Sequence, residues 1–324
     1  MSEFSPPLIY VWIGSKLPDW GFTSLELTRS YSPARKMILI VDKEPGNAAR
    51  FAAIGVEVRV RSQARDREKF ETLSTQFRGG FWRYTSERFE CLAEYSREFS
   101  VGRFFHAELD NIVFGLDGLS DVLDQVGEGV FSPRDNAERA IGSLIYVNRS
   151  ESVEEVVASY QSDDPPGNDM IALGRYLNDS KYGHALPTEA ALSRQANWAY
   201  VDARLCGGIF DAAAIGQYLL GVDPRNQPYR PVRNLFRNEN NLIDFRRLVF
   251  RADEGGLYVA SRHGAKEYRI LNLHVHSKAM KKARELLQGG SLVELINTGK
   301  GFTVVKHHRA VTGPFLRAFK GFRR

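Results

Sequence analysis

The chain has 324 residues, of which 43% are hydrophobic and 26% are charged. This composition allows a sizeable buried core and excludes wholesale disorder. The net charge of +5 suits an anionic ligand. Six basic residues and no acidic residue fall in 306–324, so the rest of the chain is close to neutral. The charge therefore argues against a general nucleic-acid-binding protein.

Targeting and redox signals are sparse. Cys91 and Cys206 are too few for a disulfide framework, and we expect both to be buried. Residues 1–7 carry no basic stretch ahead of an apolar run, and no stretch reaches the ~20 apolar residues of a membrane helix. We expect a soluble, cytoplasmic protein.

The first elements alternate between strand and helix. Apolar runs at 8–13 and 37–41 and alternating valines at 56–60 predict strands, and 24–29 and 45–54 predict helices between them. Such alternation is typical of an α/β fold whose mostly parallel sheet carries helices on both faces.

The remaining elements continue this pattern, and no internal repeat is present. A helix at 81–99 precedes a strand at 101–105 that leads directly into an acidic segment. Further helices are predicted at 119–126, 153–160, 169–177, 211–220 and 278–287, and further strands at 143–147, 257–260 and 269–276. Residues 222–237, rich in Pro, Arg and Asn, are predicted to form a long loop.

Two carboxylates, Glu108 and Asp110, stand two residues apart where the fourth strand ends. In extended backbone, such residues point to the same side. Open α/β sheets bind ligands at the carboxyl edge, and paired carboxylates there suit Mg²⁺ or Mn²⁺. The alternative is that both are ordinary solvent-facing acids.

A second polar group lies late in the chain. His274 and His276 are predicted to share one face of a strand, and Lys278 follows. Neutral imidazole is a good Mn²⁺ ligand, and lysine is a point charge for phosphate. Histidines buried in a core are the alternative.

The order of these features resembles that of nucleotide-sugar-dependent glycosyltransferases with the GT-A fold. Members carry an Asp-x-Asp motif after a helix and a strand, and Glu108-Leu109-Asp110 is similar, with Glu in the first position. The resemblance implies one GT-A-like domain over 1–303, with a nucleotide-binding half at 1–115 and an acceptor and sugar half at 116–303. Residues 304–324 would form a basic amphipathic tail.

The resemblance also implies roles for the second half of the chain. His276, in preference to His274, would complete the metal shell, and Lys278 would contact the diphosphate. Gly207 and Gly208 would form a turn against which the sugar lies, although a plain strand-to-helix turn is the alternative. Glu239, the only carboxylate in 238–243, would contact the sugar near its anomeric carbon. An exposed helix start explains that segment equally.

Further contacts are implied for the nucleotide and the acceptor. Trp12 and Ile13 would meet the base, and Asp42 would accept a hydrogen bond from the base or ribose. Arg83, preferred over Arg88, would lie near the phosphates. Asp169 would be the general base of an inverting reaction, unless it only caps a helix.

Together these features predict transfer of a sugar from a nucleotide-diphosphate donor, with UDP-sugars favoured, to a hydroxyl of a glycan or lipid-linked acceptor. The order of motifs leans slightly towards a retaining reaction. Phe315, Phe319 and Phe322 alternate with basic residues in the tail, which suits an anionic inner-membrane surface. The alternatives are a sugar-phosphate nucleotidyltransferase and a non-catalytic scaffold protein with the same fold.

Overall fold

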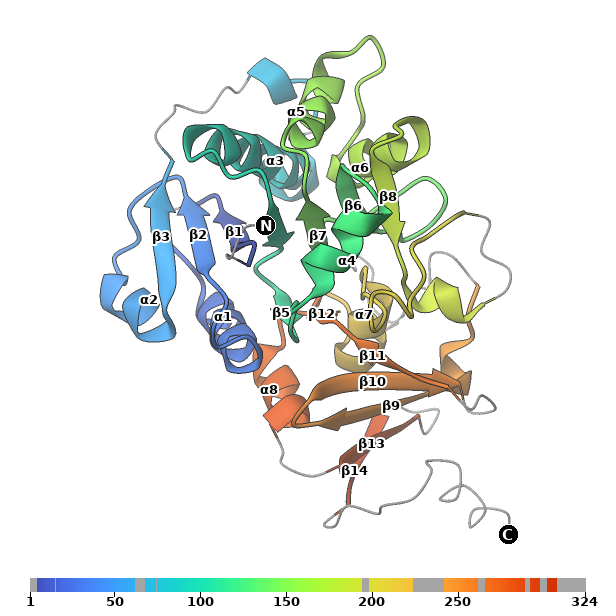
Figure 1. The fold of residues 1–324 in the computed structure, drawn as a ribbon. Helices are drawn as coiled ribbons and strands as arrows, with labels where there is room; N and C mark the ends of the chain where they lie inside the picture. Colours follow the sequence, from blue (N-terminus) through green and yellow to red (C-terminus); the bar gives the residue numbers. More distant parts are fainter. Residues whose placement is uncertain are drawn as a thin grey trace.

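The large sheet of the molecule is mixed and mostly parallel (Figure 1). The computed structural model describes residues 5–14, 16–61, 68–73, 75–193, 198–223, 242–261, 266–288, 292–297 and 302–307. The sheet has the order β3 (Val56–Val60), β2 (Met37–Val41), β1 (Leu8–Trp12), β4 (Phe104–Ala107), β7 (Leu144–Val147), β6 (Val130–Pro133) and β8 (Gly183–Leu186). Only β7 runs antiparallel to its neighbours. The predicted α/β class is confirmed.

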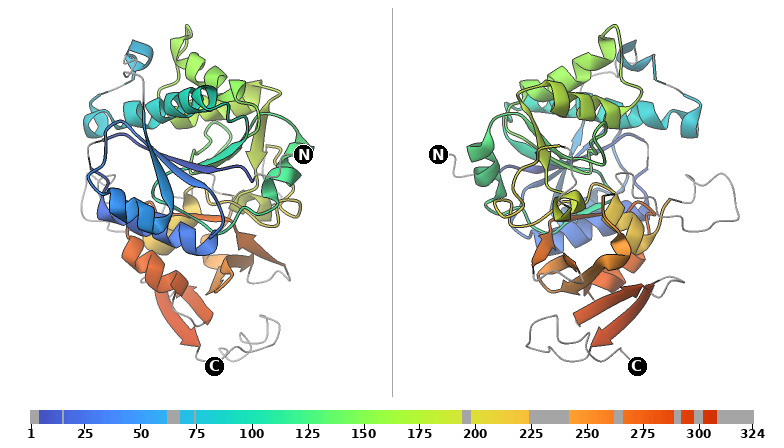
Figure 2. Two further views of the ribbon diagram at one scale, coloured as in Figure 1. Left: turned by 60° about the vertical axis from the view of Figure 1, so that its left-hand side comes forward. Right: turned by 90° about the vertical axis from the view of Figure 1, so that its right-hand side faces the viewer.

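Helices cover both faces of this sheet (Figure 2). The helices α1 (Asp19–Tyr31), α2 (Ala48–Ile54) and α4 (Leu119–Val126) cover one face, and α3 (Phe81–Glu98), α5 (Glu151–Ala158) and α6 (Asp169–Asp179) cover the other. Successive strand residues enter opposite cores: Leu8 and Tyr10 pack on the first side, and Ile9 packs on the second. Burial on both sides explains why the early strands are continuous apolar runs.

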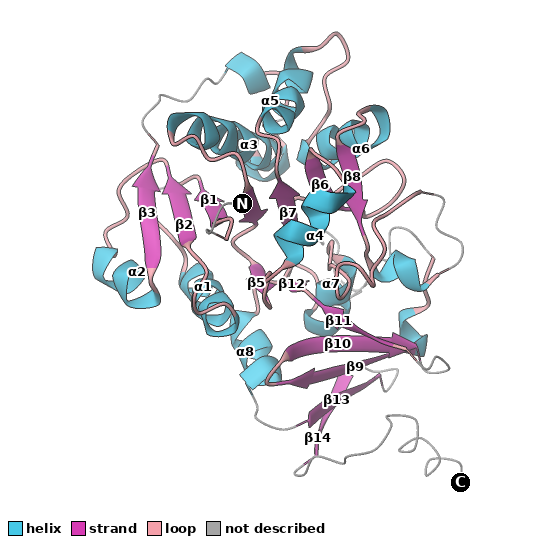
Figure 3. Cartoon of the chain, viewed as in Figure 1, coloured by secondary structure: helices cyan, strands magenta, loops and turns pink. Residues whose placement is uncertain are grey.

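A second β layer lies beside the large sheet (Figure 3). It is an antiparallel sheet with the order β11 (Glu267–Ile270), β10 (Gly256–Ser261), β9 (Leu248–Asp253), β13 (Leu292–Asn297) and β14 (Phe302–His307). The short strands β5 (Asn111–Val113) and β12 (Asn272–His274) pair with each other between the two sheets. The helices α7 (Ala214–Leu220) and α8 (Met280–Gln288) complete a third core around them.

Short 3-10 helices complete the described secondary structure. They lie at Glu68–Phe70, Phe77–Gly79, Ser159–Gln161, Glu189–Leu192 and Phe245–Arg247.

Several predicted elements have other limits in the structure: the helix predicted at 24–29 spans Asp19–Tyr31, for example, and the strand predicted at 101–105 spans Phe104–Ala107. The predicted strand 269–276 is two strands, because β11 pairs with β10 whereas β12 pairs with β5. The predicted helix 211–220 begins only at Ala214, since the Asp211 carboxylate accepts hydrogen bonds from the N–H groups of Ile215 and Gly216. The predicted boundary between 303 and 304 falls inside β14, and residues 308–324 of the predicted tail lie outside the described residues.

Both cysteines are free and buried, as predicted. Among the described residues, no helix combines the length and apolar character needed to cross a membrane.

Candidate metal centre

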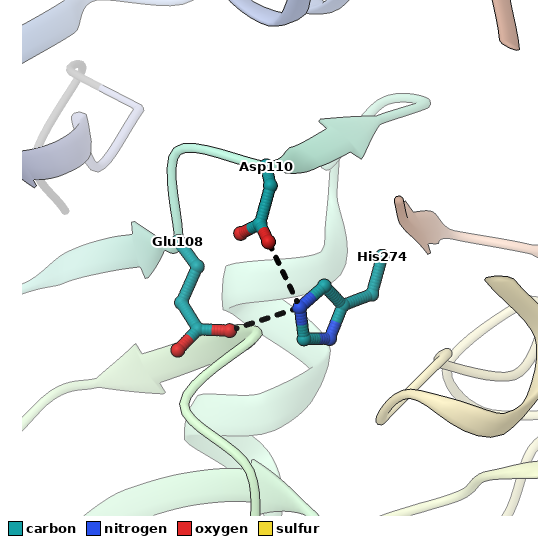
Figure 4. A group of neighbouring side chains, drawn as sticks. All are labelled: Glu108, Asp110 and His274. Carbon is teal, nitrogen blue, oxygen red and sulfur yellow. Dashed lines mark ion pairs between the residues drawn. The ribbon is translucent and has the colours of Figure 1, made fainter. Parts of the chain in front are cut away.

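The Glu108–Asp110 turn connects β4 of the large sheet to β5. Its backbone is closed by a hydrogen bond from the Asn111 N–H to the Glu108 carbonyl oxygen, at 3.0 Å. Leu109 between the two acids is buried and packs on Gly21, where a Cβ atom would approach it to 2.8 Å. The buried leucine anchors the turn and leaves both carboxylates on the side that faces His274 (Figure 4).

His274 reaches these acids from the other end of the chain. It is the last residue of β12 and pairs with Asn111 of β5. Its Nε2 atom lies 3.3 Å from Oε2 of Glu108 and 3.4 Å from Oδ2 of Asp110 (Figure 4). One ligand atom from each of the three side chains lies within 4.8 Å of the other two. Pairing of two short strands thus assembles the group.

The second ring nitrogen of His274 decides which tautomer faces the acids. Its Nδ1 atom lies 2.7 Å from the carbonyl oxygen of Ala212, which can only accept a hydrogen bond. Nδ1 therefore carries a proton, and Nε2 offers either a lone pair or a second proton to the carboxylates. A carbonyl bound to the far nitrogen is the usual way to orient a metal-binding imidazole.

Arg88 and Lys278 balance the carboxylates. Arg88 of α3 is buried and forms ion pairs with Glu108 and, at 2.5 Å, with Asp169. Lys278 forms an ion pair with Asp110, and its φ of 60° is unusual for a residue other than glycine. Backbone hydrogen bonds on either side, from Lys278 N–H to Val275 and from Met280 N–H to Lys278, hold this conformation.

The pKa values follow from these pairs. Burial raises the pKa of Asp110, but Lys278 and His274 outweigh burial and hold it well below its usual range. Burial also raises the pKa of Glu108, and Arg88 and His274 lower it overall. Burial lowers the pKa of His274, whereas Asp110 and Glu108 raise it to about 9. The group therefore holds two ionised acids and, without a cation, an imidazolium.

The chemistry of this donor set fits a divalent cation. Two carboxylate oxygens and one imidazole nitrogen suit Mn²⁺, and Mg²⁺ accepts the same oxygens. A divalent cation could take the place of the proton on Nε2 of His274. Lys278 would then stand beside the cation as a charge for a phosphate oxygen.

The structure places His274, rather than the preferred His276, in this group. Backbone pairing ends at His274, so the two imidazoles do not continue along one strand face. Nδ1 of His276 accepts a hydrogen bond from the N–H of Asp223 at 3.0 Å. The ring centroids of the two histidines are 5.9 Å apart.

Arg88, which sequence reasoning ranked below Arg83, is the arginine of α3 that reaches Glu108. Arg83 lies one and a half turns nearer the start of α3 and is half-buried. The side chain of Asn168, rather than that of Asp169, caps α6 by accepting a hydrogen bond from the Ile171 N–H at 3.0 Å.

Asp169 is linked through Arg88 to the three residues Glu108, Asp110 and His274, here called the metal group. The carboxylate is buried and binds the Thr85 hydroxyl at 2.9 Å as well as Arg88. Burial raises its pKa despite the charge of Arg88. In this geometry Asp169 orients Arg88, which in turn holds Glu108.

The predicted nucleotide contacts lie at the ends of β1 and β2. Asp42, just after β2, accepts a hydrogen bond from the Gly14 N–H at 2.9 Å and so ties the two loops together. Trp12 and Ile13 are both half-buried. Trp12 packs edge-on against Trp20, and the Trp20 ring lies 5.7 Å from Nζ of Lys278. The end of β1 is thus linked to the metal group through Trp20.

The predicted glycine turn packs against the backbone of β11. Gly207 has a φ of 69°, a conformation that favours glycine. A Cβ at Gly208 would overlap the backbone carbonyl of Arg269, so close packing alone requires glycine there. The turn leads to Asp211 and Ala212, whose contacts orient His274. Glu239 lies outside the described residues.

Five residues behind the group were not predicted: Asn111, Ser143, Asp211, Gly216 and Asn272. All but Gly216 are fully buried polar side chains, and a Cβ at Gly216 would overlap the carbonyl oxygen of His274. Asn111 and Asn272 directly neighbour predicted site segments, which is the one signal that the sequence offered.

Comparison with known proteins finds similarity to solved glycosyltransferases. No family model matches the chain, and no curated protein matches it. An active-site mutant of LgtC aligns with 12% identity and a TM-score of 0.38, over 62% of this chain and 81% of that one. The PaToxG glycosyltransferase aligns with 11% identity and a TM-score of 0.32, over 53% and 69% respectively. The bifunctional glycosyltransferase WbbM aligns with 12% identity and a TM-score of 0.32, over 56% of this chain and 36% of WbbM. These values are too low to assign the chain to a family.

Proposed function

We propose that the protein is a metal-dependent glycosyltransferase that moves a sugar from a nucleotide-diphosphate donor to an acceptor hydroxyl. One observation carries the proposal: Glu108, Asp110 and His274 converge beside Lys278 at the carboxyl end of a central strand in a mostly parallel sheet. Ligands of open α/β sheets bind at that end.

Each residue of the group would have a separate role in binding a diphosphate. When bound, Mn²⁺ or Mg²⁺ would neutralise the charge that develops on the departing nucleoside diphosphate. Glu108, Asp110 and His274 would hold the cation, and Lys278 would bind a phosphate oxygen. Arg88 keeps Glu108 ionised and in place, and Asp169 holds Arg88.

The finer assignments follow from the sequence resemblance. Trp12, Ile13 and Asp42 would bind the nucleoside, with a UDP-sugar favoured as donor. Gly207 and Gly208 would border the sugar, and Glu239 would lie near its anomeric carbon in a retaining reaction. The acceptor would be a glycan or a lipid-linked glycan, with the basic tail on an anionic membrane.

A panel of nucleotide-sugars tests the proposal. With Mn²⁺ present, we expect one donor to be hydrolysed slowly and to transfer its sugar when acceptors are added. The Glu108→Ala, Asp110→Ala double variant should lose this activity. Release of pyrophosphate from a nucleoside triphosphate and a sugar phosphate would instead indicate a nucleotidyltransferase. If the protein binds no nucleotide, either with or without Mn²⁺, the non-catalytic scaffold would be favoured.

A further inference from the structure

Behind the metal group lies a set of fully buried polar side chains, Asn111, Ser143, Asp211 and Asn272, here called the buried polar tetrad. Burying polar groups costs free energy unless each is hydrogen-bonded. The tetrad joins segments separated by as many as 161 positions in the chain. We propose that the tetrad positions the metal-binding side chains, with Asn272 as its central residue, an inference that rests on the proposed function.

Asn272 joins the two halves of the group. Its Nδ2 donates to Oδ1 of Asn111 and to the carbonyl oxygen of Asp211, both at 2.9 Å. Its Oδ1 accepts from the N–H of Asp211 at 3.1 Å. One amide therefore links the residue after Asp110 to the residue before Ala212, whose carbonyl orients His274.

Ser143 fixes the acidic turn from the other side. Its carbonyl oxygen accepts from the Glu108 N–H at 3.1 Å and from Nδ2 of Asn111 at 2.6 Å. Its hydroxyl donates to the carbonyl oxygen of Asp211 at 3.0 Å. Both ends of the turn that carries Glu108 and Asp110 are thus held by one residue, which directly precedes β7.

Asp211 fixes the backbone of His274. Its Oδ2 accepts from the N–H groups of His274, at 2.9 Å, and Gly216, at 2.8 Å, and its Oδ1 accepts from Ile215 at 3.0 Å. Glycine at 216 lets the start of α7 lie directly against the His274 carbonyl. With the Ala212 contact to Nδ1, these bonds leave the imidazole one orientation, towards the acids.

The test measures Mn²⁺ affinity without turnover. Mn²⁺ is titrated into the full-length protein, and the concentration of free Mn²⁺ is measured by electron paramagnetic resonance. Thermal unfolding is measured separately. Asn272→Leu keeps the side-chain shape and removes its hydrogen bonds. We expect Mn²⁺ affinity to fall about 10- to 100-fold, as for other residues that orient metal ligands.

Asn148→Leu is the matched control. Asn148 has the same bonding pattern, since its Nδ2 donates to Asp124 and to the Gly127 carbonyl and its Oδ1 accepts from the Gly129 N–H. It follows β7 at the end remote from the metal group. Its loss should lower the melting temperature and leave Mn²⁺ affinity unchanged, which separates positioning from stability.

A double variant and a milder variant complete the design. In a His274→Ala background, Asn272→Leu should cost less additional affinity, because only its effect on the acidic turn through Asn111 remains. If Asn272→Leu does not fold, Asn272→Asp, which keeps the acceptor oxygen, should still weaken Mn²⁺ binding. Wild-type affinity in a folded Asn272 variant would overturn the inference alone. Absence of Mn²⁺ binding in the wild type would overturn the proposed metal site itself.

Discussion

Two buried clusters of charged side chains share helix α3, and they differ in which elements supply their acidic residues. In the metal group, Arg88 joins acids from two other elements, and His274 arrives from a third. In the second cluster, Arg61 pairs with Glu87, Glu90 and Glu94, all on one face of α3, and Lys69 adds a further pair to Glu90.

The difference shows that buried charge alone does not bring possible metal-ligand atoms together. Arg61 binds both oxygens of Glu94 at 2.6 Å, and the acids around it compensate its charge. Burial lowers the pKa of Arg61, yet these carboxylates raise it overall. Among the described residues, only Glu108, Asp110 and His274 bring three possible ligand atoms together. The cluster around Glu108 is therefore suited to binding a cation. The cluster around Arg61 is suited to holding the end of β3 against α3.

The largest expected effect belongs to Asp110→Asn. Losing a carboxylate that, on the proposed function, would hold the cation and that faces Lys278 should remove several kcal/mol of transition-state stabilisation, or roughly a 10³-fold fall in turnover. Nucleotide-sugar hydrolysis measures it, with Glu90→Gln as a control expected to keep wild-type turnover. A fall of less than tenfold in Asp110→Asn would contradict the assignment.

Arg61→Met should affect stability instead. It leaves three acids on α3 without their shared cation, and breaking a buried pair in this way costs about 3–5 kcal/mol. Urea unfolding measures the loss, while Mn²⁺ affinity should remain as in the wild type. A matching loss of Mn²⁺ affinity would show that the two clusters are not independent.

Mn²⁺ binding should depend on pH through His274, which belongs to the metal group and has no counterpart in the Arg61 cluster. The pKa of His274, raised to about 9, lies above its unfolded value of about 6.5. The stabilisation from its proton is therefore complete below about pH 6.5 and is lost as pH rises through 9. Because the cation must displace that proton, Mn²⁺ affinity should rise by up to about tenfold per pH unit from 7 towards 9.

Calorimetric titrations in two buffers of different ionisation enthalpy would detect the released proton directly. His274→Gln should bind Mn²⁺ more weakly and with a flatter pH profile. An equally steep profile in that variant would assign the proton to another group.

The smallest expected effect is that of His276→Ala. Nδ1 of His276 accepts a backbone hydrogen bond from Asp223, and its imidazole is not in the three-residue group. We expect Mn²⁺ affinity to change by less than about threefold, against a far larger loss in His274→Ala. The reverse order would restore His276 as the ligand that the sequence resemblance favoured.

The sequence predicted the parts of the fold that local pattern controls. The strands Met37–Val41 and Val56–Val60 and the helix Leu119–Val126 have the predicted limits. Charged residues bound the apolar run of the first, and apolar periodicity with neighbouring glycines defines the other two. The short strands β5, β6 and β8 were not predicted, since their three or four residues carry no clear period. Their existence depends on pairing with distant strands.

The sequence predicted which types of residue form the candidate site. It did not predict which of two histidines and which of two arginines belong to it. Glu108, Asp110 and Lys278 stand in recognisable local patterns. The choice of His274 over His276 depends on where β12 ends, and the choice of Arg88 over Arg83 depends on which turn of α3 faces β4. Neither follows from spacing alone, because both are set by tertiary packing.

The most direct test of the metal-diphosphate site is calorimetric titration of the wild-type protein with UDP, with and without Mn²⁺. We expect saturable binding that requires Mn²⁺ and disappears in the Glu108→Ala, Asp110→Ala double variant while the fold is retained. UDP binding of equal strength without the metal, or in the folded double variant, would contradict it.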